Sequence, residues 1–170
     1  MAVQEFYFFG SYNALRPFQI KVFSGADSKF TIPTQGTGYN YRAKVSGVVD
    51  ISGLTGNYTI NFPSANTDYI LEISGLFPQW RQNNNAERLK VKDVMQCGDI
   101  VWRSFNFSFY GCSNLLYTAT DVPNVSNVND FNSAFRNTLV NVNVNSWDWS
   151  SAKTLSGTFW NGIWDNNGVK

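Results

Sequence analysis

Acidic side chains are the first residues of this sequence that could do chemistry. Two carboxylates on either side of a bond can hydrolyse a glycoside, and Asp99, Asp121, Asp130 and Asp148 stand at corresponding or nearby positions before aromatic segments. A carboxylate in such a place usually accepts hydrogen bonds from backbone amides. The spacing therefore predicts that these aspartates form turns, with calcium binding as the alternative.

Other catalytic groups are missing or isolated. The chain has no histidine, the usual base near neutral pH. The glycines of GTGYN (Gly36 to Asn40) lack the spacing of a phosphate-binding loop and indicate a turn. Cys97 and Cys112 belong to no CxxC pattern; they are predicted to be two buried thiols or a disulfide, and without histidine a metal site is disfavoured. We expect no enzyme, no cofactor and no metal.

Aromatic side chains are the residues that could recognise a partner. Exposed Trp and Tyr among Asn residues are typical of sugar-binding faces and protein interfaces. The three tryptophans near the C-terminus have an alternative role, in core packing or in capping the end of the fold. The four aromatics near the N-terminus should pair with a sheet or with a neighbouring subunit. The predicted interface consists of Phe6, Tyr7, Phe8, Phe9, Trp149, Trp160 and Trp164.

Composition limits the partners. The net charge is +1 and charged residues make up only 15% of the chain, so no electrostatic field favours nucleic acid. No apolar run reaches the length of a membrane span, so no membrane insertion is expected. The first residues, MAVQEFYFFGSYNALRPF, lack the pattern of a signal peptide. The sequence thus predicts a protein that is not exported by a signal of its own.

Residues 1–82 are predicted to form a β-sandwich domain that begins with an aromatic strand, EFYFF. Short runs rich in aromatic and β-branched residues follow one another between Gly, Pro, Asn and Ser, the pattern of a small antiparallel sandwich. Phe18, Ile20 and Val22 alternate onto one face. The composition shifts near residue 83, where Asn becomes frequent.

Residues 83–170 contain a repeat. Its three copies are offset by 26 and 24 residues, and within each copy the apolar positions fall at i, i+3 and i+7, which predicts a short helix. Each unit is expected to add an extended stretch, such as LVNVNVNSW, and to stack on its neighbours. The predicted repeat core is Trp102, Phe105 and Phe109, then Val128, Phe131 and Phe135, then Ala152, Leu155 and Phe159.

Two segments give this repeat a family resemblance. CGDIVWRSFNFSFYGCSNL (Cys97 to Leu115) and TDVPNVSNVNDFNSAF (Thr120 to Phe135) resemble the units of BspA-type leucine-rich repeat surface proteins. The resemblance implies a leucine-rich-repeat-like solenoid of about three repeats, preceded by a PKD-like (Ig-like) sandwich over residues 18–75. Where that sandwich family has DWGDG this chain has KVSGV, Lys44 to Val48, so a turn or ion contact of those aspartates is lost or altered.

The predicted fold is therefore mainly β with short helices, and the predicted function is structural. A short member of such a family without a signal fits a virion structural protein: a capsid decoration, spike or fibre component on the virion surface. Its expected partners are other virion proteins, copies of itself in a homo-oligomer, and a host surface protein or glycan. The alternative is an adhesin module on a bacterial cell surface that binds host protein or glycan.

Overall fold

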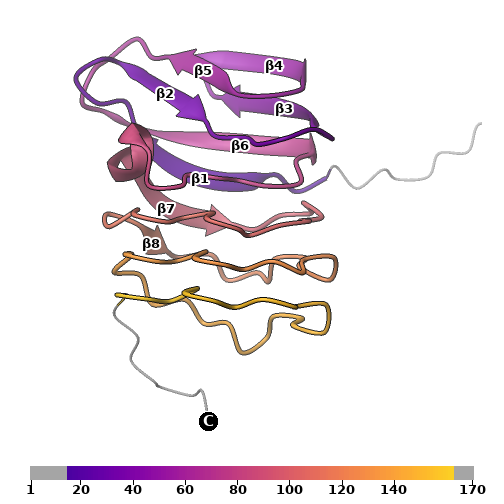
Figure 1. Ribbon diagram of the computed structural model, residues 1–170. Coiled ribbons are helices and arrows are strands. Elements are labelled where there is room, and N and C mark those ends of the chain that lie inside the picture. The colour runs from indigo at the N-terminus through magenta and orange to yellow at the C-terminus, as the bar shows by residue number, and fades with distance from the viewer. Residues whose placement is uncertain (1–14, 163–170) are drawn as a thin grey trace, which may run out of the picture.

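The structure, a computed structural model, describes residues 15–162 and is mainly β (Figure 1). Its one helical element is a 3-10 helix within those residues, η1 (Ala86–Lys90). The strands are β1 (Phe18–Phe23), β2 (Lys29–Ile32), β3 (Asn40–Val45), β4 (Val49–Leu54), β5 (Tyr58–Asn61), β6 (Asp68–Leu76), β7 (Val91–Gln96) and β8 (Leu116–Tyr117).

Six of these strands form one mixed sheet in the order β4-β3-β6-β1-β7-β8. Its central pairs are antiparallel, with Ile20 of β1 opposite Leu71 of β6 and opposite Val94 of β7. The last pair, β7 with β8, is parallel. The sheet thus combines strands from both sides of residue 82, the expected domain boundary.

β2 and β5 make a separate antiparallel pair, with Phe30 opposite Ile60. Both side chains are buried in the same core cluster as Ile20 and Leu71 of the larger sheet. The alternation read from the sequence is confirmed in β1, where Phe18, Ile20 and Val22 are buried and the residues between them are half-buried. A period of two fixes which face of a strand enters the core.

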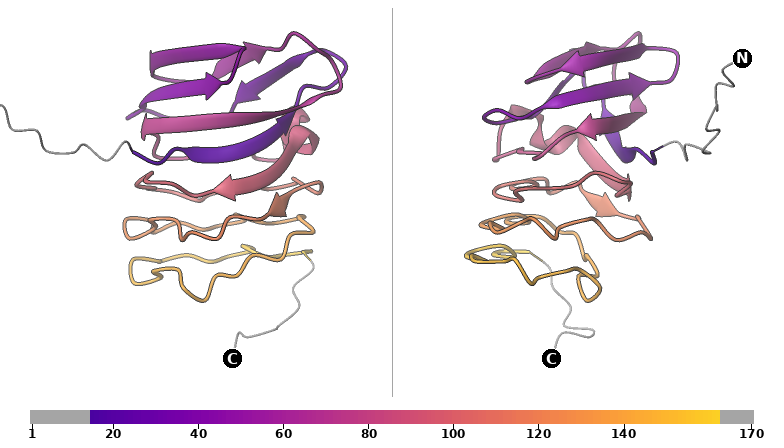
Figure 2. Two further views of the ribbon diagram at one scale, coloured as in Figure 1. Left: turned by 180° about the vertical axis from the view of Figure 1, so that it is seen from behind. Right: turned by 90° about the vertical axis from the view of Figure 1, so that its right-hand side faces the viewer.

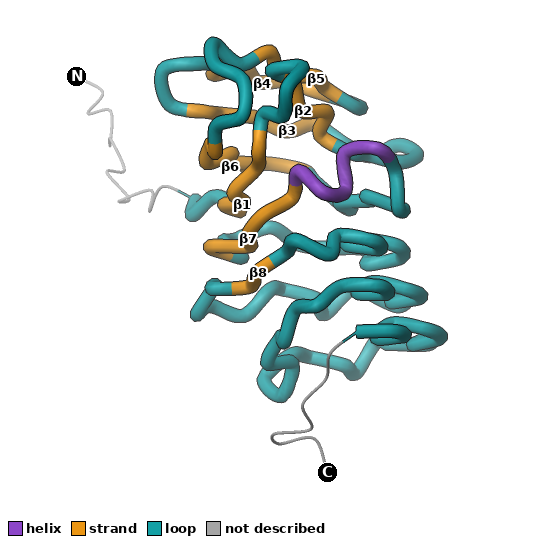
Figure 3. Tube along the Cα trace, turned by 90° about the vertical axis from the view of Figure 1, so that its left-hand side faces the viewer, coloured by secondary structure: helices purple, strands orange, loops and turns teal. Residues whose placement is uncertain are grey.

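Below β1, residues 97–162 form what we call the stack (Figures 1 and 2). The chain circles in successive layers, and Figure 3 shows that most of this path is neither helix nor strand. Three ladder segments, residues 105–111, 131–137 and 155–161, lie one below the other. Alternate amides of each segment donate to carbonyls of the next, from Phe105 N to Asp130 O (2.9 Å) and from Phe131 N to Thr154 O (3.0 Å).

The short helices predicted for the repeat are wrong. The ladder segments are chains of turns, because left-handed residues interrupt each one at equivalent positions. Such residues cannot continue a right-handed helix, and in the two upper segments their amides bond between layers instead of along the chain. The interrupting residues are Phe107, Ser133 and Gly157 in one series, and Gly111, Asn137 and Asn161 in the other, with φ between 54° and 81°.

On the opposite side of the stack, LVNVNVNSW is extended but pairs in no strand. Its alternation holds: Val140, Val142 and Val144 are buried, whereas Leu139 is 57% exposed. The stack therefore closes a core between its ladder segments and this return path, and that core is continuous with the core of the sheets.

Candidate interaction surfaces

An inner column of aromatic rings connects the sheets to the stack. Trp80 stacks on Phe109 with ring centroids 6.4 Å apart, Phe109 on Phe135 at 5.4 Å, and Phe135 on Phe159 at 5.9 Å. The last three rings come from equivalent positions, and their interplanar angles of 18° and 13° keep them nearly parallel. Phe109 and Phe135 thus bury their faces against the rings above and below.

A second set of rings fills the other half of the layers. Phe105 lies 5.5 Å from Phe131, and Phe131 lies 4.7 Å from Trp149. Trp147, which the repeat register does not include, is buried and contacts both Phe105 and Trp149. Trp149 is half-buried and its Nε1 donates to the carbonyl of Val144 at 3.1 Å, so of its two predicted roles the structure places it in core packing.

Trp160 lies in an outer column. The guanidinium of Arg136 lies over its ring at 4.4 Å and also over the Tyr110 ring at 5.2 Å. Tyr110, Arg136 and Trp160 directly follow the three stacked phenylalanines, so they occupy equivalent positions in three layers. The Trp160 side chain is 63% exposed. It is the predicted interface residue that the structure presents to solvent, with its ring held by a cation.

The remaining predicted interface residues, Phe6, Tyr7, Phe8, Phe9 and Trp164, lie outside the described residues. Among the predicted core residues, the two upper layers are buried. Ala152 and Phe159 in the lowest layer are partly buried. Leu155 is a correction, because 53% of it is exposed. Its layer has no described layer beneath it, so the position that is covered at Phe131 is open at Leu155.

The aspartates are occupied by structural hydrogen bonds. Asp121 accepts from the amides of Cys97 (2.8 Å) and Gly98 (2.9 Å) where β7 leads into the stack. Asp130 accepts from the amide of Asn132 and from the side chain of Asn106, both at 2.9 Å. Asp148 accepts from the amide of Ser150, and the hydrogen bonds from the Ser150 side chain and amide hold the pKa of the Asp148 carboxyl below its usual range.

Asp99 also accepts structural hydrogen bonds, in its case from a residue just before β1. It accepts from the backbone amide of Arg16 at 2.8 Å and pairs with the Arg16 guanidinium. These bonds to Arg16 lower the pKa of the Asp99 carboxyl. No group of three or more His, Cys, Asp or Glu within residues 15–162 could hold a metal ion.

Both cysteines of the chain are free thiols and both are buried. Burial raises the pKa of Cys97 to about 12, although the Tyr117 hydroxyl lies 3.0 Å from its sulfur. Burial also raises the pKa of the Cys112 thiol. A nucleophilic cysteine needs an accessible thiolate, so neither thiol is suited to covalent catalysis.

An apolar groove of about 440 Å³ opens where the sheet meets the stack. Leu15, Leu76 and Val101 line it and are 67%, 62% and 48% exposed. Arg103 and Asp99 add charge at its rim. The sequence did not indicate this groove, because its walls come from four segments (residue 15, residue 38, residues 75–78 and residues 99–103) that are far apart along the chain and are not apolar runs.

The comparisons with known proteins gave no match to a family model, a curated protein or a solved structure. In the part of the chain that the structure describes, no helix is both long and apolar enough to cross a membrane.

Proposed function

We propose that this protein is a non-enzymatic structural protein of a virion, exposed on the particle as a capsid decoration, spike or fibre component. In this proposal the sheets are a PKD-like β-sandwich and the stack is a short leucine-rich-repeat-like solenoid, as the sequence resemblance implies. Its role is to make contacts with other virion proteins, with copies of itself in a homo-oligomer, or with a host surface.

One observation carries the proposal: the carboxylates of the stack accept hydrogen bonds from the chain itself, while two apolar side chains of its lowest layer are exposed to solvent. Asp121, Asp130 and Asp148 accept from groups of the chain itself. Leu155 and Trp160 are instead more than half exposed. Exposed apolar groups gathered at one place favour contacts with macromolecules, whereas hydrolysis would require free carboxylates.

The test is whether the protein co-purifies with intact virus particles at a fixed copy number. We expect a constant ratio to the major capsid protein through successive density gradients. Absence from the particles, combined with binding of the isolated chain to host cells, would contradict the virion assignment.

Trp160 favours a second candidate, an adhesin module of a bacterial cell surface. The exposed Trp160 is followed in the chain by Asn161, and the backbone amide of Asn137 donates to the Trp160 carbonyl at 2.9 Å. An exposed indole among amide side chains can bind the face of a sugar. In this case the isolated chain binds host cells or glycans and Trp160→Ala removes the binding, whereas Leu139→Ala, at another exposed apolar position, leaves it unchanged.

A further inference from the structure

The lower edge of the lowest ladder segment presents backbone amides as hydrogen-bond donors. In the two upper segments, every second amide donates to the layer beneath, with Phe109 N to Ala134 O and Phe135 N to Thr158 O both 2.7 Å long. The equivalent amides of the lowest segment begin at Leu155 and continue at Gly157 and Asn161. Within residues 15–162 these three amides have no acceptor.

This edge offers donors without acceptors. The carbonyls of Leu155 and Gly157 already accept from the amides of Thr158 and Trp160, each at 3.1 Å, inside the turns of the same segment. The upper segments do the same, as with Phe105 O and the amide of Ser108 at 3.0 Å. Within the ladder segments, the backbone amides that bond between layers therefore all donate downward. Only a group with free acceptors can satisfy the amides of the last segment.

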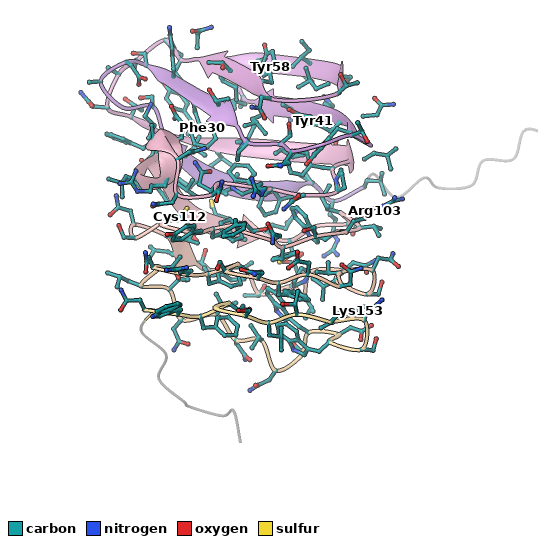
Figure 4. All side chains as sticks on the ribbon, viewed as in Figure 1. Phe30, Tyr41, Tyr58, Arg103, Cys112 and Lys153 are labelled. Atoms are coloured by element: carbon teal, nitrogen blue, oxygen red, sulfur yellow. The ribbon has the colours of Figure 1, made fainter. Side chains whose placement is uncertain are left out.

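The surroundings of the edge are apolar. Leu155 and Trp160 are 53% and 63% exposed, and Phe159 and Trp149 are partly buried against the core from the other side. Figure 4 shows side chains of the lowest layer below its ribbon, and the labelled Lys153 at its edge. An extended segment binds to an edge that has a row of unpaired backbone amides next to apolar side chains, and this edge has both.

We propose that the lower edge of the stack binds an extended segment of a partner polypeptide. The segment lies parallel to residues 155–161, and its alternate carbonyls accept from the amides of Leu155, Gly157 and Asn161. Its apolar side chains cover Leu155, as the third layer covers the second. The inference rests on the proposed role in protein contacts and identifies the surface and the chemistry of one partner.

A second copy of the chain is a poor occupant. A two-fold axis through this edge would place donors opposite donors. At the upper end of the stack the ladder carbonyls are already covered, because Gln82, Asn83 and Asn84 donate to Ser108 O, Phe107 O and Tyr110 O at 3.0, 3.0 and 2.9 Å. Stacking of intact copies head to tail thus finds no free acceptor row, so the partner is a different polypeptide.

Amide hydrogen exchange resolved by residue tests the free chain first. The amides of Phe131, Ser133 and Phe135 are expected to be protected at least about 100-fold more than those of Leu155, Gly157 and Asn161, because interior ladders open only with larger unfolding. Equal protection in the dilute free chain would overturn the proposal, since the edge would then be covered already by this chain.

A synthetic peptide with the sequence of residues 126–138 is the probe for binding, since this segment covers the equivalent edge of residues 105–111. Saturating peptide is expected to protect the amides of Leu155, Gly157 and Asn161. Leu155→Pro deletes one donor and should weaken binding about 3- to 10-fold beyond Leu155→Ala, which keeps it.

Protection of the Phe135 amide in both variants serves as the check that the stack is folded. Absence of protection at millimolar peptide, or equal weakening by the two substitutions, would overturn the proposal. Either result would leave the co-purification test of the proposed function unaffected, because the peptide experiment uses the isolated chain.

Discussion

The sheets and the stack share one core but pair their backbones in different ways. In β1, β6 and β7, hydrogen bonds join antiparallel strands, and burial alternates along β1. In the stack, turns follow one another and the bonds run from layer to layer. Both arrangements satisfy the same requirement that buried amides find acceptors. Regular secondary structure is therefore not needed where equivalent positions repeat closely in space.

The two regions also specify their register by different means. A strand needs only an apolar residue at every second position, so β1 would tolerate exchanges among Phe, Ile and Val. In the stack a ring rests on the ring of the next layer, as Phe109 rests on Phe135. We therefore expect large-to-small substitutions to be most costly in the middle of the stack, where both faces of a ring are covered.

Phe135→Ala is expected to have the largest effect. Phe135 is fully buried between Phe109 and Phe159 and contacts Trp147. Loss of this side chain should lower the free energy of unfolding by about 3–5 kcal/mol, as for other buried phenylalanines. Denaturant unfolding followed by fluorescence measures the change.

Phe159→Ala is the matched control, because the same ring in the lowest layer is only partly buried. We expect it to cost about half as much or less, since an open site loses less transfer free energy and leaves no closed cavity. If both substitutions were equally costly, the lowest layer would be as well covered as the middle one. A neutral Phe135→Ala would disprove the ring column itself.

Alkaline pH is expected to destabilise the protein through the stack and its junction with the sheets, where both thiols lie. Burial raises the pKa of Cys97 from 9.0 in an accessible thiol to about 12, and raises that of Cys112 as well. The folded chain therefore holds these protons more tightly than the unfolded chain. The resulting stability is complete below pH 9 and is lost as the pH rises from 9 toward 12, by at most about 1.4 kcal/mol per pH unit for each thiol.

The double variant Cys97→Ala and Cys112→Ala isolates this effect from tyrosine and lysine ionisation. Its free energy of unfolding should fall less steeply than that of the wild type between pH 9 and pH 11, as measured by urea titration at each pH. Parallel curves would show that the thiols ionise equally well in the folded chain, and the stack would then be more open to water than the sheets.

The strands were predictable from sequence and the path of the stack was not. Alternation in β1 and β6 fixes buried and exposed faces locally. Spacing of i, i+3 and i+7 suits both a helix and a pair of turns. The distinguishing signal was available in Gly111, Asn137 and Asn161, because Gly and Asn at three equivalent positions favour the left-handed region. Phe107 and Ser133 also have positive φ angles, both of 54°, but their residue types do not indicate this conformation.

The candidate surfaces were predictable in part. Trp160 was identified as an aromatic that could stay exposed, but its contact with Arg136 was not foreseen, because it follows only from the stacking of equivalent positions. The repeat alignment did not include Trp147, because it lies in the return path, where no second copy aligns with it. The apolar groove at Leu15 and the donor edge at Leu155 depend on which segments meet in space, which periodicity along the chain does not reveal.

Arg136→Lys tests whether the outer column adds to the cohesion of the layers. A planar guanidinium can cover Tyr110 and Trp160 at once, whereas an ammonium cannot stack on two rings. The expected loss is about 1 kcal/mol, in keeping with exposed cation–π contacts. Arg103→Lys is the control, because no ring contact of Arg103 is found among residues 15–162. An equal loss in both variants would assign the effect to charge or solvation instead of stacking.

Asn137→Gly is expected to have the smallest effect. Substitution by glycine should raise the free energy of unfolding in the stack but lower it in the sheets. Asn137 has φ of 55° at the position that Gly111 occupies one layer higher, so glycine relieves a left-handed residue and keeps the amide that donates to Trp160 O. We expect a gain of up to about 0.5 kcal/mol. Lys21→Gly in β1, a half-buried strand position, should instead cost about 0.5–1 kcal/mol, because glycine weakens a strand. If Asn137→Gly were as costly as Lys21→Gly, the turns of the stack would depend on the Asn137 side chain and not on its backbone conformation.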